Sequence, residues 1–283
     1  TQLKFGLNSL NELGLELEKY KFNKILLVID PIFHEFDVTQ RILDQIKFSN
    51  VETIIYDDIS IEPTLESFEK ASEFAKKKSF ELIIAVGGGS TIDTAKVLNL
   101  IKVCGGQVID YVNPPIGRGK KPVSSLLPLV AIPTTSGSGS EATTVAVLDI
   151  PDLKIKTGIS HRFLKPVLAL VDPGLSKTIP AGVTASSGLD VICHAIESYI
   201  SKPYNQRKKP NSLDDRPLYQ GSNPISDIWS MKAIDYGGQF LSRAVNDSSD
   251  LEARGNMMLS ATLVGIGFGS AGVHIPHACA YPI

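Results

Sequence analysis

The side chains best suited to hold a metal ion lie toward the end of the 283-residue chain. Asp190 and His194 are four residues apart in an apolar stretch, so on a helix their carboxylate and imidazole would share one face. The pair also fits a buried Asp–His ion pair without a metal, and both interpretations stay open. His274 and His277 supply further imidazoles. Aspartate and histidine without a thiolate suit Fe(II) or Zn(II).

A run of glycines could approach a phosphate group. Gly87-Gly88-Gly89-Ser90 follows a short apolar run at 82–86 and precedes a segment with helical spacing. Without side chains, backbone N–H groups can come close to an anion, and the start of the following helix adds partial positive charge. A tight strand-to-helix turn would use the same residues. The run is neither the spaced dinucleotide fingerprint nor a P-loop.

Two other polar positions follow predicted strands. Thr134 begins a segment of Thr, Ser and Gly residues after the strand predicted at 127–133. Asp30 ends the strand predicted at 24–30, where an acid can bind a ribose or cap a turn, and Pro31 stands where a Rossmann domain would carry glycine. Open α/β sheets bind ligands at the carboxyl ends of their strands. The glycine run and the segment that begins at Thr134 both follow predicted strands of one domain, and together they favour a nucleotide site.

The elements that must position these residues alternate in the first part of the chain. Apolar β-rich runs predict strands at 24–30, 51–56, 81–86, 127–133 and 167–171, and amphipathic stretches predict helices at 38–48, 65–78 and 91–104. This alternation predicts an α/β domain with a mostly parallel sheet, from residue 1 to residue 174. Beyond Asp172-Pro173-Gly174 only helical spacing continues, at 183–200, 225–245 and 250–267, which predicts an all-α domain over 175–283. This domain carries the candidate metal ligands, and we expect it to be the metal-binding and catalytic domain.

Composition argues against several other classes of function. Lys plus Arg number 28 against 30 Asp plus Glu, so the chain has no global field for nucleic acid or an anionic membrane. Its three cysteines lie far apart, which speaks against a disulfide framework or a cysteine-rich zinc site. The apolar runs are shorter than the roughly 18 residues that span a bilayer. The chain stops in mid-pattern, so we expect further residues at its C-terminus, and no targeting segment is evident.

Taken together, these residues resemble the iron-containing (group III) alcohol dehydrogenase family over essentially the whole chain. The marks of the resemblance are Gly87-Gly88-Gly89-Ser90 with Asp93 and Lys96, the segment 133–141, Asp172-Pro173, and Gly188-Leu189-Asp190 with His194. The segments 219–229 and 265–269 are more narrowly similar to the hydroxyacid-oxoacid transhydrogenase branch. The family implies an α/β nucleotide-binding domain followed by a helical metal domain.

The resemblance also implies a set of metal ligands, one aspartate and three histidines. Asp190 and His194 match the first two, and alignment on the proline near the C-terminus makes His277 the third. Tyr281 falls where many relatives carry a histidine near the substrate, which makes it a candidate catalytic residue. The fourth ligand is expected beyond the last residue given. His274 has no counterpart, so we expect a structural or supporting role for it.

The resemblance implies NAD and a divalent metal, Fe(II) or alternatively Zn(II), as cofactors. The residues that we expect to bind NAD, from the resemblance and, for Asp30, from its place at the end of a strand, are Asp30, Gly87, Gly88, Gly89, Ser90, Asp93, Thr134, Thr135, Ser138 and Lys156. An acid at Asp30 would accept hydrogen bonds from a ribose and repel a 2′-phosphate, which predicts NAD over NADP. For Lys156, an ordinary exposed lysine is the alternative.

The implied reaction moves hydride through bound NAD from a 4-hydroxy acid such as 4-hydroxybutyrate to a 2-oxo acid such as 2-oxoglutarate. Arg216, in the basic segment 202–225, is the candidate partner of a substrate carboxylate. Alternatives are an NAD-dependent alcohol dehydrogenase for another small alcohol or hydroxy acid, and a catalytically incomplete nucleotide-binding fragment. We expect a homo-oligomer, a dimer, that binds neither nucleic acid nor membrane. In a eukaryote it would lie in the mitochondrial matrix, otherwise in the cytoplasm.

Overall fold

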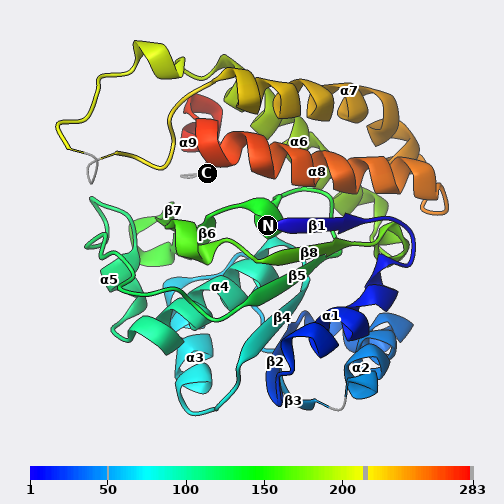
Figure 1. The fold of residues 1–283 in the computed structure, drawn as a ribbon. Coiled ribbons are helices and arrows are strands. Elements are labelled where there is room, and N and C mark those ends of the chain that lie inside the picture. The colour runs from blue at the N-terminus through cyan, green and yellow to red at the C-terminus, as the bar shows by residue number, and fades with distance from the viewer. Residues whose placement is uncertain (50, 213–215, 281–283) are drawn as a thin grey trace. The chain divides into compact units, whose positions relative to one another are not determined.

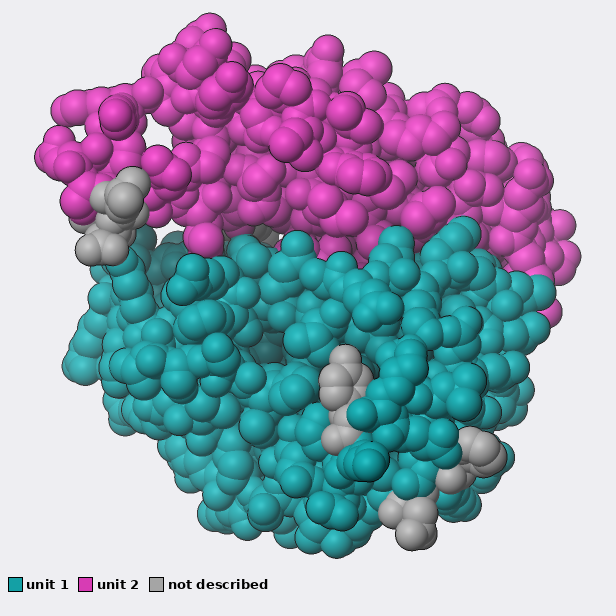
Figure 2. All heavy atoms as spheres, in the orientation of Figure 1, with its two compact units in different colours: residues 1–134, 144–175 teal, residues 135–143, 176–283 magenta. Residues whose placement is uncertain are grey.

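The chain folds into two compact units, coloured separately in Figure 2. The computed structural model describes residues 1–49, 51–212 and 216–280. Unit 1 comprises 1–134 and 144–175, and unit 2 comprises 135–143 and 176–283. The division after Leu175 lies next to the boundary expected after residue 174. The small-residue segment 135–143 belongs to unit 2, whereas the sequence had suggested that it was part of the first domain.

Unit 1 is built on a sheet whose neighbouring strands all run parallel. Within the described residues its strands are β1 (Gln2–Phe5), β2 (Lys24–Ile29), β3 (Glu52–Tyr56), β4 (Leu82–Gly87), β5 (Leu129–Pro133) and β8 (Leu168–Val171). Their order is β1-β8-β5-β4-β2-β3 (Figure 1). All five predicted strands are present, which confirms the parallel α/β architecture.

Helices cover both faces of this sheet. They are α1 (Leu13–Tyr20), α2 (Asp37–Phe48), α3 (Leu65–Lys76), α4 (Gly89–Cys104) and the short α5 (Val108–Tyr111). Successive side chains of a strand point to opposite faces. On β2, Ile25, Leu27 and Ile29 therefore pack with α1 and α2, whereas Leu26 and Val28 pack with α3 and α4. All five are fully buried, as in parallel sheets that lie between two helical layers.

Three strands were not predicted from the sequence. β1 lies at the edge of the sheet, and three of its four residues are exposed, so its pattern lacks an apolar run. β6 (Val145–Ile150) and β7 (Ile155–Ser160) form an antiparallel hairpin outside the main sheet. The side chains of β6 alternate between buried and half-buried positions, a weaker signal than the continuous apolar runs of the parallel strands.

Unit 2 consists largely of helices. They are α6 (Ala181–Ile200), α7 (Pro224–Asn246), α8 (Leu251–Ala271) and α9 (Ile275–Ala280). The first three confirm the predicted helices, and the all-α character of the C-terminal region is confirmed with them. Asn223 begins α7 with a capping box, and the Asp250 side chain caps α8 by accepting a hydrogen bond from the Ala253 amide. None of the described helices is long and apolar enough to cross a membrane.

The core of unit 2 joins three of these helices. Val191 and Ala195 of α6 pack with Ala233 of α7 and with Val264 and Phe268 of α8. A Cβ on Gly188 of α6 would lie 2.3 Å from Cδ1 of Leu241, so a glycine at this position lets α6 and α7 pack closely. The core therefore fixes the face of α6 that bears Asp190 and His194 relative to the end of α8.

Candidate metal centre and nucleotide-binding loop

One face of α6 carries the aspartate and histidine predicted as metal ligands. Asp190, His194 and Glu197 occupy positions i, i+4 and i+7, so the helical repeat places them on one stripe. Their side chains become less accessible along it: Asp190 is 41% exposed, His194 11% and Glu197 2%. The stripe therefore runs from a partly hydrated carboxylate to a buried one.

The third predicted ligand, His277, lies beyond a turn that follows α8. Gly272 follows the last residue of that helix and has a φ of 88°, a backbone conformation that favours glycine. A Cβ on Gly272 would also lie 3.0 Å from the Cβ of Tyr219, so the position has little room for a side chain. Beyond this turn α9 begins, and His277 lies within it.

The three predicted ligands form a compact cluster. Nδ1 of His194 and Nε2 of His277 lie 3.3 Å and 3.5 Å from Oδ1 of Asp190. One candidate ligand atom from each residue lies within 4.8 Å of the other two. The two imidazole rings are 4.3 Å apart between centroids, and the ring of Phe268 stacks on His194 at 4.6 Å. Residues from α6 and α9 thus converge, with an aromatic ring of α8 against one of them.

Glu197 is a further member of this site that the sequence analysis did not identify. Its Oε1 lies 2.5 Å from Nδ1 of His277, and its Oε2 accepts a hydrogen bond of 2.7 Å from the backbone N–H of His274. The signal that could have found it is its spacing of seven residues from Asp190 on the same helix.

The surroundings shift the pKa values of these groups in different directions. Burial lowers the pKa of His194, so this ring is neutral near pH 7. Burial also acts to lower the pKa of His277, but its contacts with Asp190 and Glu197 outweigh burial and raise that pKa. For Glu197, burial acts to raise the pKa, and the hydrogen bonds from His274 and His277 bring it below its ordinary value. Glu197 is therefore ionised near neutral pH.

This arrangement fits a divalent metal ion. It offers a carboxylate oxygen and two imidazole nitrogens, which are donors that Fe(II) and Zn(II) accept. Nδ1 of His194 is buried, and the described part of the chain provides it with no hydrogen bond of normal geometry. A buried ring nitrogen without such a bond is costly, and coordination to a cation beside the Asp190 carboxylate would remove the cost. Asp190, His194 and His277 are thus the residues that would hold the ion.

In unit 1, the carboxyl ends of β2, β4 and β5 lie together at the run Gly87–Ser90, called the glycine loop below. The Asp30 amide donates to the Val86 carbonyl, and the Thr134 amide donates to the Gly87 carbonyl, both at 3.1 Å. Gly87 has a φ of 158°, and a Cβ there would lie 2.3 Å from Oγ1 of Thr91, so the loop requires glycine. No side chain of the described residues caps α4, which leaves the first amides of this helix available to an anion.

Two predicted nucleotide-binding side chains at this edge also support local turns. Oδ1 of Asp30 accepts a hydrogen bond of 3.1 Å from the Ile32 amide and thereby caps the turn that follows β2. Oγ of Ser90 accepts one of 3.2 Å from the Glu62 amide. Both residues therefore lie where the sequence placed them, at the carboxyl end of the sheet, with part of their hydrogen-bonding capacity already used.

Asp93 connects α4 to the β6–β7 hairpin. Its side chain accepts hydrogen bonds from Nζ of Lys96 at 3.2 Å and from the Val147 amide at 2.9 Å. Lys96 is fully buried and donates to the Val145 carbonyl at 2.6 Å. In the structure these two residues of the predicted motif make contacts that attach the hairpin to the helix.

Lys156, the other predicted cofactor residue on the hairpin, is engaged by acids. Its Nζ lies 2.6 Å from Oε2 of Glu62 and 3.7 Å from Oδ1 of Asp149. Glu62 is also the residue whose amide donates to Ser90. A chain of contacts therefore leads from the glycine loop to Lys156 within unit 1.

The remaining predicted site residues lie elsewhere. Thr135 and Ser138 belong to unit 2, in the segment 135–143. A Cβ on Gly139 would lie 2.6 Å from the Ala261 carbonyl, so this segment packs closely against α8. Arg216 is exposed in the loop that precedes α7. Tyr281 lies outside the described residues.

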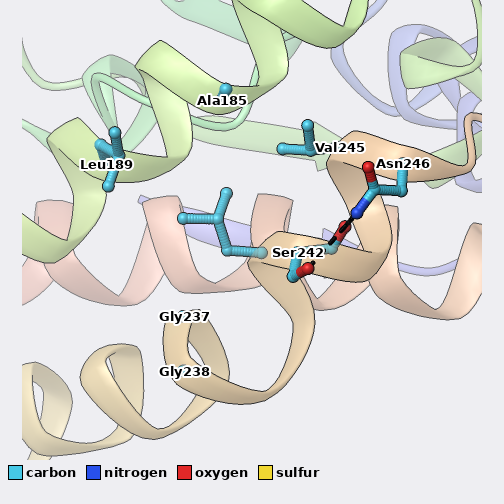
Figure 3. A pocket seen from close by; sticks show the side chains of 8 residues that line it. Ala185, Leu189, Gly237, Gly238, Ser242, Val245 and Asn246 are labelled. Atoms are coloured by element: carbon cyan, nitrogen blue, oxygen red, sulfur yellow. Dashed lines mark hydrogen bonds between the residues drawn. The ribbon is translucent and has the colours of Figure 1, made fainter.

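A separate groove runs between α6 and α7 (Figure 3). Its volume is about 400 Å³, and it is lined by Ala185, Leu189, Gly237, Gly238, Leu241, Ser242, Val245 and Asn246. These lining residues include no titratable group and none of the three candidate ligands.

The sequence is similar to curated enzymes over its full length. It is 46% identical to the mitochondrial hydroxyacid-oxoacid transhydrogenase of Bos taurus, over 99% of this chain and 61% of the bovine protein. It is 44% identical to the Homo sapiens protein of the same description, over 100% of this chain and 61% of the human protein. The chain therefore spans about three fifths of the length of these relatives.

Solved structures share the fold. An archaeal alcohol dehydrogenase from a Red Sea brine pool, bound to NZQ, superposes with a TM-score of 0.87 at 27% identity, covering 100% of this chain and 67% of that one. A sulfoacetaldehyde reductase from Bifidobacterium kashiwanohense, in complex with NAD+, gives a TM-score of 0.83 at 28% identity, covering 100% of this chain and 69% of that one.

Two family descriptions match separate parts of the chain. Residues 1–173 match the iron-containing alcohol dehydrogenases, and residues 218–283 match the C-terminal part of the Fe-containing alcohol dehydrogenase family. The first match covers more than half of the chain, and its C-terminal counterpart includes His277. The chain belongs to the iron-containing alcohol dehydrogenase family.

Proposed function

We propose that this protein is a metal-dependent oxidoreductase that transfers hydride through bound NAD from a 4-hydroxy acid to a 2-oxo acid. The observation that carries the proposal is the Asp190–His194–His277 cluster, found in a chain that is 46% identical to a hydroxyacid-oxoacid transhydrogenase. Fe(II) is the proposed metal and Zn(II) the alternative, since the donor atoms accept either.

The residues of the cluster have distinct tasks in this proposal. A bound divalent ion supplies Lewis acidity, which stabilises the negative charge that an alcohol oxygen acquires as its proton leaves. Asp190 contributes charge, and the neutral His194 contributes a ring nitrogen that needs no deprotonation. Phe268 covers one face of the His194 ring and keeps water from it.

Most of the residues proposed to bind the cofactor belong to unit 1. The glycine loop and the uncapped start of α4 suit a pyrophosphate, because backbone amides there can bind an anion without a side chain in the way. Asp30 lies at the end of the neighbouring strand β2, where its second carboxylate oxygen can accept a hydrogen bond from a ribose. We extend the cofactor proposal to Thr134, Thr135, Ser138 and Lys156.

The proposed substrates are carboxylates, and this separates them from simple alcohols. Arg216 is exposed and lies between α6 and α7 in sequence, in a segment with more basic than acidic residues. A guanidinium can bind a carboxylate through two parallel hydrogen bonds. We assign this task to Arg216, and we keep Tyr281 as a candidate contact near the reacting carbon.

Isotope transfer tests the proposal directly. The purified protein is incubated with 2-oxoglutarate and with 4-hydroxybutyrate that carries deuterium on its carbinol carbon, without added NAD. We expect deuterium at C2 of the 2-hydroxyglutarate formed, detected by mass spectrometry, and no transfer by the Asp190→Ala variant.

Each alternative predicts a different result in the same assay. An ordinary NAD-dependent dehydrogenase needs added NAD and releases reduced cofactor into solution. A nucleotide-binding fragment binds NAD but transfers no deuterium under either condition. Either result contradicts the transhydrogenase proposal.

Location and assembly follow the same proposal. The curated relatives are mitochondrial by description, so we propose a mitochondrial location if the source is a eukaryote. We further propose that the protein forms a homodimer. Native mass spectrometry measures the subunit number and, in the same spectrum, the masses of bound NAD and metal.

A further inference from the structure

Glu197 connects two segments that are far apart in sequence. It lies on α6 and is 2% exposed, yet both of its oxygens are used by residues about eighty positions away. Oε1 contacts the His277 ring at 2.5 Å and Oε2 accepts from the His274 amide at 2.7 Å. This buried carboxylate therefore attaches α9 and the turn before it to the helix that carries Asp190 and His194.

The contact with the His277 ring determines which nitrogen of that ring carries the proton in its neutral form. An ionised carboxylate can only accept hydrogen bonds, so Nδ1 of His277 must carry the proton. In the neutral ring, Nε2 then holds the lone pair, and Nε2 is the atom that lies 3.5 Å from Oδ1 of Asp190. The tautomer selected by Glu197 is thus the one able to coordinate an ion in the cluster.

Only a carboxylate can satisfy both donors at once. An amide in its place has a single oxygen and an NH₂ group. If the oxygen faces His277, the NH₂ group opposes the His274 N–H, and two donors meet. If the amide is reversed, its NH₂ group donates to Nδ1, and the proton of His277 moves to Nε2, where it blocks coordination.

We propose that Glu197 is a positioning residue that selects the Nδ1–H tautomer of His277 and orients its Nε2 toward the metal centre. This inference rests on the metal site of the proposed function. It adds a residue that acts through His277 and that does not itself touch the metal or the substrate. Contacts of this kind typically change metal affinity by about 10- to 100-fold.

The first experiment needs neither metal nor a variant. Long-range ¹H–¹⁵N NMR spectra of the metal-free protein, recorded at a pH where His277 is neutral, distinguish the two tautomers from their ring nitrogen shifts. The His277→Ala variant identifies the signals. We expect the Nδ1–H form, and an Nε2–H form in the wild-type protein would overturn the proposal.

The second experiment compares metal affinity in Glu197→Gln and Ser198→Ala. Ser198 is the next residue on α6, is fully buried and accepts a hydrogen bond from Ser230, so its variant controls for a general disturbance of the helix. Titration with Zn²⁺ should show a Kd about 10- to 100-fold higher for Glu197→Gln. The Kd of Ser198→Ala should stay close to that of the wild-type protein.

The outcomes separate this inference from the metal proposal. An unchanged Kd in Glu197→Gln, with the wild-type protein binding Zn²⁺, contradicts the role of Glu197 and leaves the metal site intact. If the wild-type protein does not bind Zn²⁺ or Fe²⁺, the metal proposal fails, while the NMR spectrum still decides which tautomer Glu197 selects. If Glu197→Gln does not fold, the wild-type tautomer remains the deciding measurement.

Discussion

The candidate metal centre depends, at the scale of single residues, on how each donor is kept ready for a cation. His194 is neutral because it is buried, and a neutral imidazole offers its lone pair without first losing a proton. His277 is held by two acids, and its pKa is raised. The two histidines therefore differ in their response to acid, although their rings lie against each other.

Removal of any proposed ligand should abolish tight metal binding. We expect Asp190→Ala, His194→Ala and His277→Ala to lose bound metal and hydride transfer, because each removes one donor atom from the cluster. NAD binding, measured by calorimetry, should persist, since the glycine loop belongs to unit 1. His274→Ala is the control, because the contact of His274 with Glu197 is made by its backbone amide. Loss of metal in His274→Ala, with retention in His277→Ala, would contradict the ligand assignment.

Metal affinity should fall in mild acid. A proton and a metal compete for His277, and the raised pKa of this ring makes the competition stronger as the pH falls through that pKa. The stability of the metal-free protein changes with pH in the opposite direction. The contact of charged His277 with the two acids stabilises the fold below pH 6.5, and this stabilisation is lost as the pH rises through the raised pKa. Zn²⁺ titrations and thermal denaturation of the metal-free protein, each across pH 5 to 9, test the two trends. A Zn²⁺ affinity that does not change over this range would contradict the role of His277.

Substrate charge should be recognised by Arg216. A charge-assisted contact of about 1.5 to 3 kcal/mol predicts that Arg216→Ala raises KM for 4-hydroxy and 2-oxo acids roughly 10- to 100-fold. Uncharged alcohols should be affected far less, as steady-state kinetics with both substrate classes will show. Equal losses of activity toward both substrate classes would indicate a folding defect. An unchanged KM would indicate that Lys202 or Arg207 binds the carboxylate instead.

At the scale of elements, the N-terminal half of α4 connects the glycine loop to the β6–β7 hairpin. Its start follows the glycine loop, and its first turns hold the β6–β7 hairpin through Asp93 and Lys96. Lys96 is fully buried and its ammonium donates to the Val145 carbonyl, so a hairpin that moved away would take a hydrogen-bond acceptor from a buried ammonium, although the ion pair with Asp93 on the same helix would remain. The contacts of Asp93 and Lys96 therefore hold the hairpin against the helix that begins at the glycine loop.

Gly87→Ala should weaken NAD binding. An added Cβ would lie 2.3 Å from Oγ1 of Thr91, so the loop or the first turn of α4 must shift. Gly105→Ala at the other end of α4 is the matched control, because Gly105 has a positive φ of 67° but open space around a Cβ. Calorimetry should show a large loss of NAD affinity for Gly87→Ala only. Equal affinities of the two variants would place the phosphate site elsewhere.

At the scale of the whole molecule, the two units have separate cores and should respond to separate ligands. A ligand at a hundred times its Kd stabilises the state that binds it by about 2.7 kcal/mol. We expect NAD to slow hydrogen exchange in unit 1, and Zn²⁺ to slow it on α6 and α9 of unit 2. Hydrogen exchange with mass spectrometry, followed by addition of a chelator, measures both effects. Protection of the glycine loop by Zn²⁺, without NAD, would contradict this division.

The sequence alone determined the features that depend on local pattern. Continuous apolar runs identified β2, β4, β5 and β8, because strands buried on both faces leave few polar positions. The edge strand β3 is only partly buried, and its β-rich residues identified it instead. The spacing of Asp190 and His194 indicated a shared helix face, since four residues make about one helical turn. The glycine run was also recognisable from local sequence, because glycine can adopt backbone conformations that other residues avoid.

The tertiary structure decided everything that depends on distant segments meeting. β1 is an exposed edge strand whose partner lies more than 160 positions away, so its own residues carry no sufficient signal. Asp93 and Lys96 gained their partners only when β6 and β7 folded against α4. The approach of His277 to Glu197, across eighty positions, required the turn at Gly272 and the packing of α6 with α8. Local spacing cannot specify such contacts, because the burial of apolar side chains that brings them together depends on the whole unit.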